Sequence, residues 1–149
     1  MKLWNFGAVA LLTATLATQI HAEEDMDQTA ILETISAMTT AFAAGNIDGV
    51  MATYEPSAVV IAQPGQPVAG DAALRAMFAE FVASGVNFAY GAHEVVVAGD
   101  TGLHLMSWTA PGPDGPMTSL SVAVLHRQPD GSWKIVIDHP FGDAVMDQE

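Results

Sequence analysis

The sequence predicts a single α+β domain in which N-terminal helices pack on one face of a curved antiparallel sheet. Helical periodicity is confined to the first half of the chain, and nearly everything after residue 85 has the pattern of strands and turns. Residues 23–149, which remain once an N-terminal segment is set aside, have about the commonest length for one domain. Helices followed by a meandering sheet are typical of the α+β class.

Three helices and a short hairpin are expected before the meander. Apolar residues recur at three- and four-residue spacing over 29–44, which is typical of an amphipathic helix, and Gly45-Asn46 ends it. Short helices are expected over 48–54 and from 71 to about 84, with Asp71 as the N-cap of the latter. A strand over 57–63 precedes the Pro64–Pro67 turn and a short return strand from Val68.

The remainder predicts four strands joined by turns. The turns contain Gly99-Asp100, the segment 111–116 and Pro129-Asp130-Gly131. The predicted strands cover residues 87–98, 102–110, 117–128 and 132–139.

Residues 1–22 have the pattern of a cleavable secretory signal. A single basic residue, Lys2, precedes an apolar stretch over 7–17, and a more polar segment ends at Ala22. The apolar stretch is too short for a lasting transmembrane helix. Ile20 is bulky for its place before the cut, so cleavage after Ala17 is the alternative. With no cysteine to carry a lipid, we expect a periplasmic or secreted protein without a membrane anchor.

The domain over 23–149 is acidic and lacks disulfides. It keeps three basic residues against 17 acidic ones, which gives a formal net charge of −14. Such a surface repels phosphate backbones, so nucleic-acid binding is not expected. The absence of cysteine leaves stability to the hydrophobic core alone.

Four stretches, in order and spacing, resemble the NTF2-like superfamily, in particular its SnoaL-like and ketosteroid-isomerase-like branch. Together they cover nearly all of residues 28–142, and they are Ala43–Gly49, Tyr54–Val59, Pro64–Gly70 and Asp130–Gly142. The resemblance implies a cone, in which a bent sheet wraps around helices and leaves a mostly apolar pocket between them. Members of this superfamily include isomerases, cyclases, dehydratases and binding modules, so the fold does not give the function.

The resemblance also locates the positions that ketosteroid isomerases use. That chemistry needs a carboxylate base and an oxyanion hole made of a tyrosine and a protonated aspartate. The base position falls on Ala62 or Gln63, the tyrosine position on Met38 and the acid position on Leu125. None of these side chains moves a proton, which excludes steroid isomerisation by the known apparatus. Met38, Gln63 and Leu125 are expected to contact a ligand instead.

Asp138 is the best candidate for chemistry. If the last hairpin closes at 129–132, Gln128 lies opposite Trp133, Leu125 opposite Val136 and Ala123 opposite Asp138. The resemblance then turns Ser121, Ala123, Leu125, Val136 and Asp138 toward the pocket. A carboxyl in an apolar pocket has a raised pKa, which suits a general acid or base. Alternatively, Asp138 caps the following turn or pairs with Tyr54, whose hydroxyl is itself a candidate ligand contact.

Other site chemistries find no support in the sequence. The histidines of the domain show no His-x-His spacing, and no cysteine is present, so no metal site is expected. No Gly-x-Ser-x-Gly elbow or glycine-rich phosphate loop occurs, which disfavours a serine hydrolase and a nucleotide enzyme. We expect no cofactor.

The outer face of the predicted sheet is apolar enough to need a cover. By the same pairing, it carries Val122, Val124, Trp133, Ile135 and Ile137. Monomers rarely expose such a patch, and NTF2-like proteins usually dimerise through this face, so a homodimer is expected. The first strand or the C-terminal tail is the alternative cover.

These observations predict an exported protein that binds a small apolar or amphipathic molecule in its cone. Cofactor-free acid–base turnover of the isomerase or hydratase type, with Asp138 as the catalytic group, is one form of this function. A non-catalytic ligand-binding module and a dimeric interaction module are the alternatives. The sequence leaves open whether the protein is an enzyme.

Overall fold

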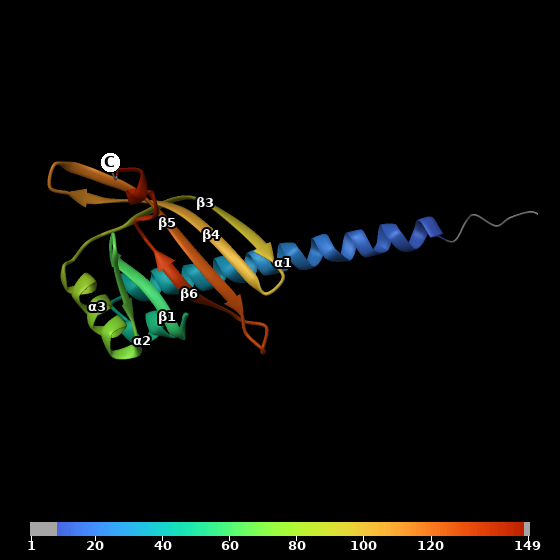
Figure 1. Cartoon of the computed structure of the whole chain (residues 1–149), viewed down its shortest axis with the longest axis horizontal. Coiled ribbons are helices and arrows are strands. Elements are labelled where there is room, and N and C mark those ends of the chain that lie inside the picture. The colour runs from blue at the N-terminus through green and yellow to red at the C-terminus, as the bar shows by residue number, and fades with distance from the viewer. Residues whose placement is uncertain (1–8, 148–149) are drawn as a thin grey trace, which may run out of the picture.

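Helices cover one face of a curved, six-stranded sheet (Figure 1), which confirms the α+β class and the packing of helices on a curved sheet. This computed structural model describes the backbone of residues 9–147 and the side chains of residues 23–146. The helices are α1 (Val9–Ala43), α2 (Ile47–Met51), α3 (Asp71–Ala83) and the 3-10 helix η1 (Gly142–Asp147). The strands are β1 (Tyr54–Gln63), β2 (Gln66–Ala69), β3 (Ala89–Ala98), β4 (Thr101–Gly112), β5 (Gly115–Arg127) and β6 (Trp133–His139).

The sheet is mixed rather than wholly antiparallel. Its strand order is β2-β1-β6-β5-β4-β3, and β1 and β6 run parallel, with Tyr54 beside Ile135 and Val60 beside Asp138. The other neighbouring strands pair antiparallel, so the expectation of a purely antiparallel sheet is wrong at one junction. Parallel neighbours need a long connection, and the whole segment from β2 to β5 provides it.

Strand β6 contains a bulge that the sequence did not reveal. Ala123 lies opposite Asp138 as predicted, but Leu125 lies opposite Ile135 rather than Val136. The extra residue, Val136, has no partner in the ladder. A bulge of this kind shifts the register by one residue and reverses the facing of the residues on one side of it.

Because of the bulge, the predicted facing of side chains near the end of the last hairpin is wrong. Arg127, not Gln128, lies opposite Trp133, and both Trp133 and Ile135 are buried in the core. The sequence placed these two side chains on the outer face because counting from the turn assumed an unbroken ladder. The outer apolar surface is consequently smaller than expected.

Helix α1 packs closely against the sheet at Gly102 of β4. A Cβ atom at Gly102 would lie 2.4 Å from Cδ1 of Ile31, so only glycine leaves room for this isoleucine. Ile31, Leu125 and Ile135 are completely buried in the same core cluster. This end of the domain is thus filled by aliphatic side chains between helix and sheet.

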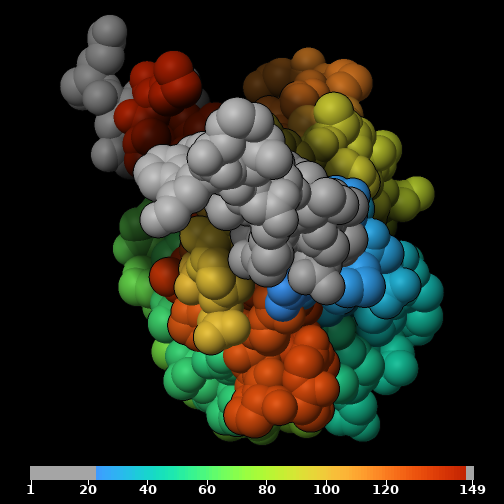
Figure 2. Space-filling view, turned by 90° about the vertical axis from the view of Figure 1, so that its right-hand side faces the viewer, coloured from blue at the N-terminus to red at the C-terminus, as the bar shows by residue number. Residues whose placement is uncertain are grey.

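Arg127 ties the start of the described part of α1 to the β5–β6 hairpin. Its guanidinium donates to the buried Asp27, contacts Asp100 at 3.3 Å and lies 5.0 Å from the Trp133 ring centroid. Figure 2 shows the start of α1 (blue) against the hairpin (orange-red) on this side of the molecule. The network fixes α1 only a few residues beyond the predicted cleavage sites.

Helix α3 starts differently from the prediction. Its N-cap is Gly70, at φ 90°, and Asp71 is the first helical residue rather than the cap. The Asp71 carboxylate instead accepts from Arg75 at 3.0 Å, one turn later, and Arg75 also contacts Asp48 of α2 at 2.6 Å. This exposed pair of contacts links α3 to α2.

The predicted signal, residues 1–22, lies entirely outside the described side chains. Helix α1 is continuous in the backbone from residue 9, whereas the sequence predicted a helix only from residue 29. Residues 1–8 lie outside the description. Within residues 9–147, no helix has the length and hydropathy needed to cross a membrane.

Candidate functional site

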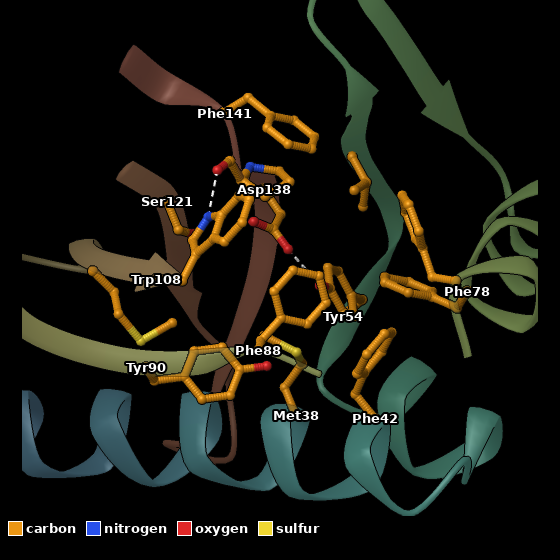
Figure 3. A pocket seen from close by; sticks show the side chains of 14 residues that line it. Met38, Phe42, Tyr54, Phe78, Phe88, Tyr90, Trp108, Ser121, Asp138 and Phe141 are labelled. Atoms are coloured by element: carbon orange, nitrogen blue, oxygen red, sulfur yellow. Dashed lines mark hydrogen bonds between the residues drawn. The ribbon is translucent and has the colours of Figure 1, made fainter. Parts of the chain in front are cut away.

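A small, mostly apolar cavity lies between the helices and the inner face of the sheet (Figure 3). Its volume is about 100 Å³. Helices α1 and α3 form one wall, and strands β1, β3, β4, β5 and β6 form the others. The lining side chains are Met38, Phe42, Tyr54, Val60, Phe78, Phe81, Phe88, Tyr90, Met106, Trp108, Ser121, Asp138, Pro140 and Phe141.

Trp108 forms a rigid wall of the cavity. Its indole Nε1 donates to the Pro140 carbonyl at 2.6 Å, which also fixes the segment after β6. The rings of Phe88 and Phe141 meet the indole edge to face, with centroids 5.2 and 5.7 Å away. A side chain held on three sides in this way keeps one rotamer.

Asp138 and Tyr54 form a buried hydrogen-bonded pair in this cavity. Tyr54 begins β1 and Asp138 lies near the end of β6, and the parallel pairing of these strands brings the two side chains together. The Tyr54 hydroxyl donates to Oδ2 of Asp138 at 2.6 Å. Phe78 of α3 packs on the Tyr54 ring with centroids 5.4 Å apart. The pairing that the sequence offered as an alternative for Asp138 is therefore present.

Burial governs the acid–base properties of this pair. It raises the pKa of the Asp138 carboxyl, and the hydrogen bond from Tyr54 and the nearby His139 offset this only in part. The pKa of Tyr54 is raised well above its usual value by burial and then by Asp138. Tyr54 therefore stays a hydrogen-bond donor at neutral pH, whereas Asp138 can exchange a proton closer to neutrality than an ordinary aspartate.

Two further hydroxyl groups line the cavity. Ser121 is buried, and within the described residues its hydroxyl makes no hydrogen bond to the protein. Ser121 lies diagonally across the β5–β6 pair from Asp138, because Ala123 is the direct partner of Asp138. Tyr90 of β3 is partly exposed, and burial followed by the Asp138 charge raises its pKa. These hydroxyls can donate to an oxygen atom of a ligand.

Four of the six predicted site residues lie at the cavity: Met38, Tyr54, Ser121 and Asp138. Gln63 does not, since it is exposed at the β1–β2 turn, 3.4 Å from Gln66. Leu125 is fully buried but lies four residues along β5 from Ser121, or about 13 Å at the usual rise per residue. The resemblance implied that Gln63 and Leu125 contact a ligand. In this chain Gln63 lies at the β1–β2 turn and Leu125 lies farther along β5, so neither lines the cavity.

Several cavity residues were not predicted as site residues. Met106 lies opposite Ser121, and Trp108 lies opposite Ser119, in the β4–β5 ladder. Extending the predicted inward face of Ser121 across the 111–116 turn would have found both, since paired residues share a face. Phe88 lies within the predicted strand over residues 87–98, but the structure places it in the connection before β3, so strand alternation did not give its facing.

No metal centre is apparent in the part of the chain that the structure describes. Within that part, no group of three or more histidine, cysteine, aspartate or glutamate side chains is arranged to hold an ion. The carboxyl of Asp138 lies among aromatic and aliphatic groups and three hydroxyls in the cavity lining rather than among ligands for a cation. The chemistry that the cavity itself supports is proton transfer and hydrogen bonding.

Comparison with solved structures shows similarity across most of the domain. A candidate ketosteroid isomerase from Shewanella frigidimarina is 19% identical with a TM-score of 0.67, over 74% of this chain and 93% of that chain. An NTF2-like protein of unknown function from Pseudomonas putida is 20% identical with a TM-score of 0.66, over 75% and 83%. A candidate dehydratase of the NTF2-like family from Streptomyces avermitilis is 20% identical with a TM-score of 0.63, over 78% and 95%. Identities this low establish the fold alone.

The family is established by sequence. A search of curated proteins gave no match. The family model described as a SnoaL-like domain matches residues 35–136, which is more than half of the chain and includes most of the cavity wall. The chain therefore belongs to the SnoaL-like domain family and has the NTF2-like fold.

Proposed function

We propose that this protein binds a small, neutral, apolar or amphipathic molecule in the cavity and exchanges a proton with it through Asp138, without a cofactor. The observation that carries the proposal is the position of the Asp138 carboxyl. It is buried in the wall of an apolar cavity, and within the described residues only its Oδ2 atom accepts a hydrogen bond. Oδ1 is free to meet a ligand.

The proposed step is proton transfer at a carbon next to a carbonyl group. Ionised Asp138 accepts the proton at Oδ1, and the C–H electron pair moves into an enolate. The hydroxyl group of Ser121 donates to the enolate oxygen. When the proton held by Asp138 is replaced by one from solvent before it returns to the same carbon, that position has exchanged with solvent, and return of the proton to another carbon isomerises the molecule. Tyr54 keeps its proton and orients the carboxyl.

The names of the structural neighbours agree with this class of chemistry. One is called a candidate ketosteroid isomerase and another a candidate dehydratase, and both reactions begin with a proton transfer. Because one fold carries proteins named for different reactions, the fold does not select the reaction, and the proposal rests on the geometry around Asp138.

The Tyr54–Asp138 hydrogen bond also suits a non-catalytic ligand-binding module. In that function, the hydrogen bond joins β1 to β6, and the two side chains provide hydrogen-bonding groups for a ligand. The two functions differ in whether Asp138 moves a proton, and this difference can be measured.

The experiment follows deuterium incorporation from D₂O into 2-cyclohexen-1-one by NMR. We expect the wild-type protein to accelerate exchange at the carbons activated by the carbonyl group. Asp138→Asn should lower this acceleration at least 100-fold, because an amide does not accept the proton. The cyclohexenone affinity and the circular dichroism spectrum should change little, since Asn keeps an oxygen that accepts from Tyr54.

Asp114→Asn is the matched control, because Asp114 is exposed in the β4–β5 turn far from the lining residues. Its exchange rate should equal that of wild type. Undiminished exchange in Asp138→Asn would refute the catalytic role. Binding without exchange in the wild type would identify a ligand-binding module instead.

We further propose that residues 1–22 direct export, which makes the protein periplasmic or secreted. The acidic residues Glu23, Glu24 and Asp25 support this proposal. After cleavage at Ala22, they would form the first turn of α1, where negative charge stabilises a helix. The Asp27–Arg127 ion pair follows directly and would hold the new helix end in place.

A homodimer through the outer face of the sheet completes the proposal. Leu120 and Ile137 are 36% and 45% exposed there, beside the half-buried Val122 and Val124. Gly142 of η1 covers part of Val122, since a Cβ at Gly142 would lie 2.5 Å from it. The rest of this apolar surface is open, and a second copy of the chain is the occupant we propose.

A further inference from the structure

The aromatic side chains of the domain are concentrated around one cavity. Its lining includes five of the six phenylalanines of the chain and both tyrosines, and the sixth phenylalanine, Phe6, lies outside the described residues. The remaining core is mainly aliphatic, with Trp133 as its aromatic member. A core built only for stability has no need to separate the two kinds of side chain. This separation suits an occupant with a π-system.

The size of the cavity limits the occupant to one ring. An apolar cavity of about 150 Å³ holds one benzene ring, whereas drug-sized ligands occupy pockets of about 300–1,000 Å³. The volume here is about 100 Å³. The Trp108 wall cannot retreat, because Pro140 holds its Nε1 and Phe88 and Phe141 pack on its ring. A fused ring system would have to displace these contacts.

The buried polar atoms of the cavity are confined to one wall. Asp138 on β6 and Ser121 on β5 are neighbours across the strand pair and meet the cavity from the sheet. Figure 3 shows Met38 and Phe42 of α1 on the opposite side, beside the Tyr90 and Phe88 rings. An occupant therefore gains from one oxygen atom directed at the sheet and from an apolar ring elsewhere.

We infer that the natural ligand is a planar, neutral molecule with a single six-membered ring and one hydrogen-bonding oxygen, such as a phenol or a cyclic enone. Aromatic walls favour a flat ring over a puckered one, the volume favours a single ring over a fused system, and the polar wall selects the oxygen. This inference rests on the proposed function for the site itself, but it concerns which molecule binds and not whether a proton moves.

Isothermal titration calorimetry of the wild-type protein tests the ligand class. The probes are phenol, 2-cyclohexen-1-one, cyclohexanol, benzene and 2-naphthol. At least one of the first two should bind 10-fold or more tightly than cyclohexanol and benzene, and 2-naphthol should show no measurable heat. Preference for phenol indicates that the wall accepts a proton donor, and preference for the enone indicates that it donates. Equal binding of cyclohexanol or of 2-naphthol would overturn the inference.

An enlarged cavity provides the matching test. Phe88 is only half-buried and lies outside the strands, so Phe88→Ala should keep the fold while opening space beside Trp108. The variant should bind 2-naphthol with measurable heat, whereas the wild type should show none. If it fails to fold, Phe81→Leu supplies a milder enlargement. Leu105→Ala, a half-buried truncation outside the cavity lining, is the control and should leave naphthol binding unchanged.

The preference for a ligand with an oxygen atom is tested by a separate variant, Ser121→Ala. Ser121→Ala should reduce the advantage of phenol or cyclohexenone over benzene at least threefold while leaving benzene affinity unchanged. An unaltered preference in both Ser121→Ala and Asp138→Asn would overturn the assignment of the polar wall. Ring binding without deuterium exchange would leave the ligand class standing and refute only the proposed proton transfer.

Discussion

His104 is a buried imidazole in the middle of β4 with no hydrogen-bond partner for either ring nitrogen among the described residues. It lies beside Val95 of β3 and Ala123 of β5, and the His93 ring is 5.8 Å away between centroids. Burial, followed by the proximity of His93, lowers the pKa of His104 to about 4. The folded protein therefore holds this residue neutral at physiological pH.

Stability should fall as the pH is lowered from 6.5 to 4 because of His104. The folded-state pKa lies below the unfolded value, so the unfolded chain binds more protons across this interval. Protonation should cost on the order of 2 kcal/mol of unfolding free energy at pH 4. Urea denaturation at pH 7 and pH 4.5 measures the loss. His104→Leu should lose less stability over the same interval, whereas an identical pH dependence would contradict this account.

The facing of a side chain was predictable from sequence where it depends on short-range strand alternation. Ser121 and Asp138 lie on the same face of the β5–β6 pair in both the prediction and the structure. The Ala123–Asp138 pair keeps the predicted register, because the bulge comes only after Val124. Gln63 and Leu125 came from the family resemblance, and this chain places them outside the cavity. A position inferred from another protein's ligand site does not carry over when strand ends and turns differ.

At the scale of elements, the contact between α1 and β4 depends on a missing side chain. Gly102 of β4 lies directly under the end of Ile31, and the nearest Trp133 atom is 3.4 Å from a Cβ placed there. The φ angle of Gly102 is not positive, so other residues could adopt its backbone conformation. Space alone requires glycine at this position.

Gly102→Ala should destabilise the domain by about 1–3 kcal/mol, because the new methyl group overlaps Cδ1 of Ile31. Ile31→Val removes that atom and should itself cost about 1 kcal/mol. The double variant should lose less unfolding free energy than the sum of the losses in the two single variants, which a double-mutant cycle in urea measures. Strict additivity would show that the two residues are not in the close contact described.

The bulge in β6 explains which parts of the fold could not be predicted. The order and type of the elements from α1 to β6 followed from periodicity and turn residues, although Tyr54 begins β1 rather than ending a helix and η1 was not predicted. One unpaired residue at Val136 then reversed the facing of Trp133 and Ile135. Neither side chain carries a local signal for this, since both are apolar and fit either face. Packing against α1 and Arg127 decides it.

At the scale of the whole molecule, the domain's few basic side chains are all engaged. Arg75 joins α2 and α3, Arg127 joins α1 to the sheet, and Lys134 donates to the Ala52 carbonyl at 2.9 Å. The rest of the surface is dominated by carboxylates. Together with the apolar cavity lining, this distribution favours neutral over anionic ligands.

Native mass spectrometry of protein recovered from the exported fraction tests the processing and the assembly together. We expect a chain that begins at Glu23, or at Thr18 if the cut follows Ala17, and a mass twice that of one chain. Ile137→Lys should yield monomers, because it places a charge in the proposed interface. Met117→Lys is the control, since Met117 is equally exposed but lies on the alternate side of β5. A monomeric wild-type protein would refute the dimer.

The sequence by itself determined the α+β class, the order of elements, the acidic surface and the family resemblance that the SnoaL-like match confirms. These features depend on local periodicity, turn residues and composition. Only the tertiary structure decided that β1 lies parallel to β6, that Tyr54 meets Asp138, and that the aromatic rings line one apolar cavity. The Tyr54–Asp138 contact joins residues 84 positions apart, and such contacts depend on strand order and on register irregularities, which leave no local pattern.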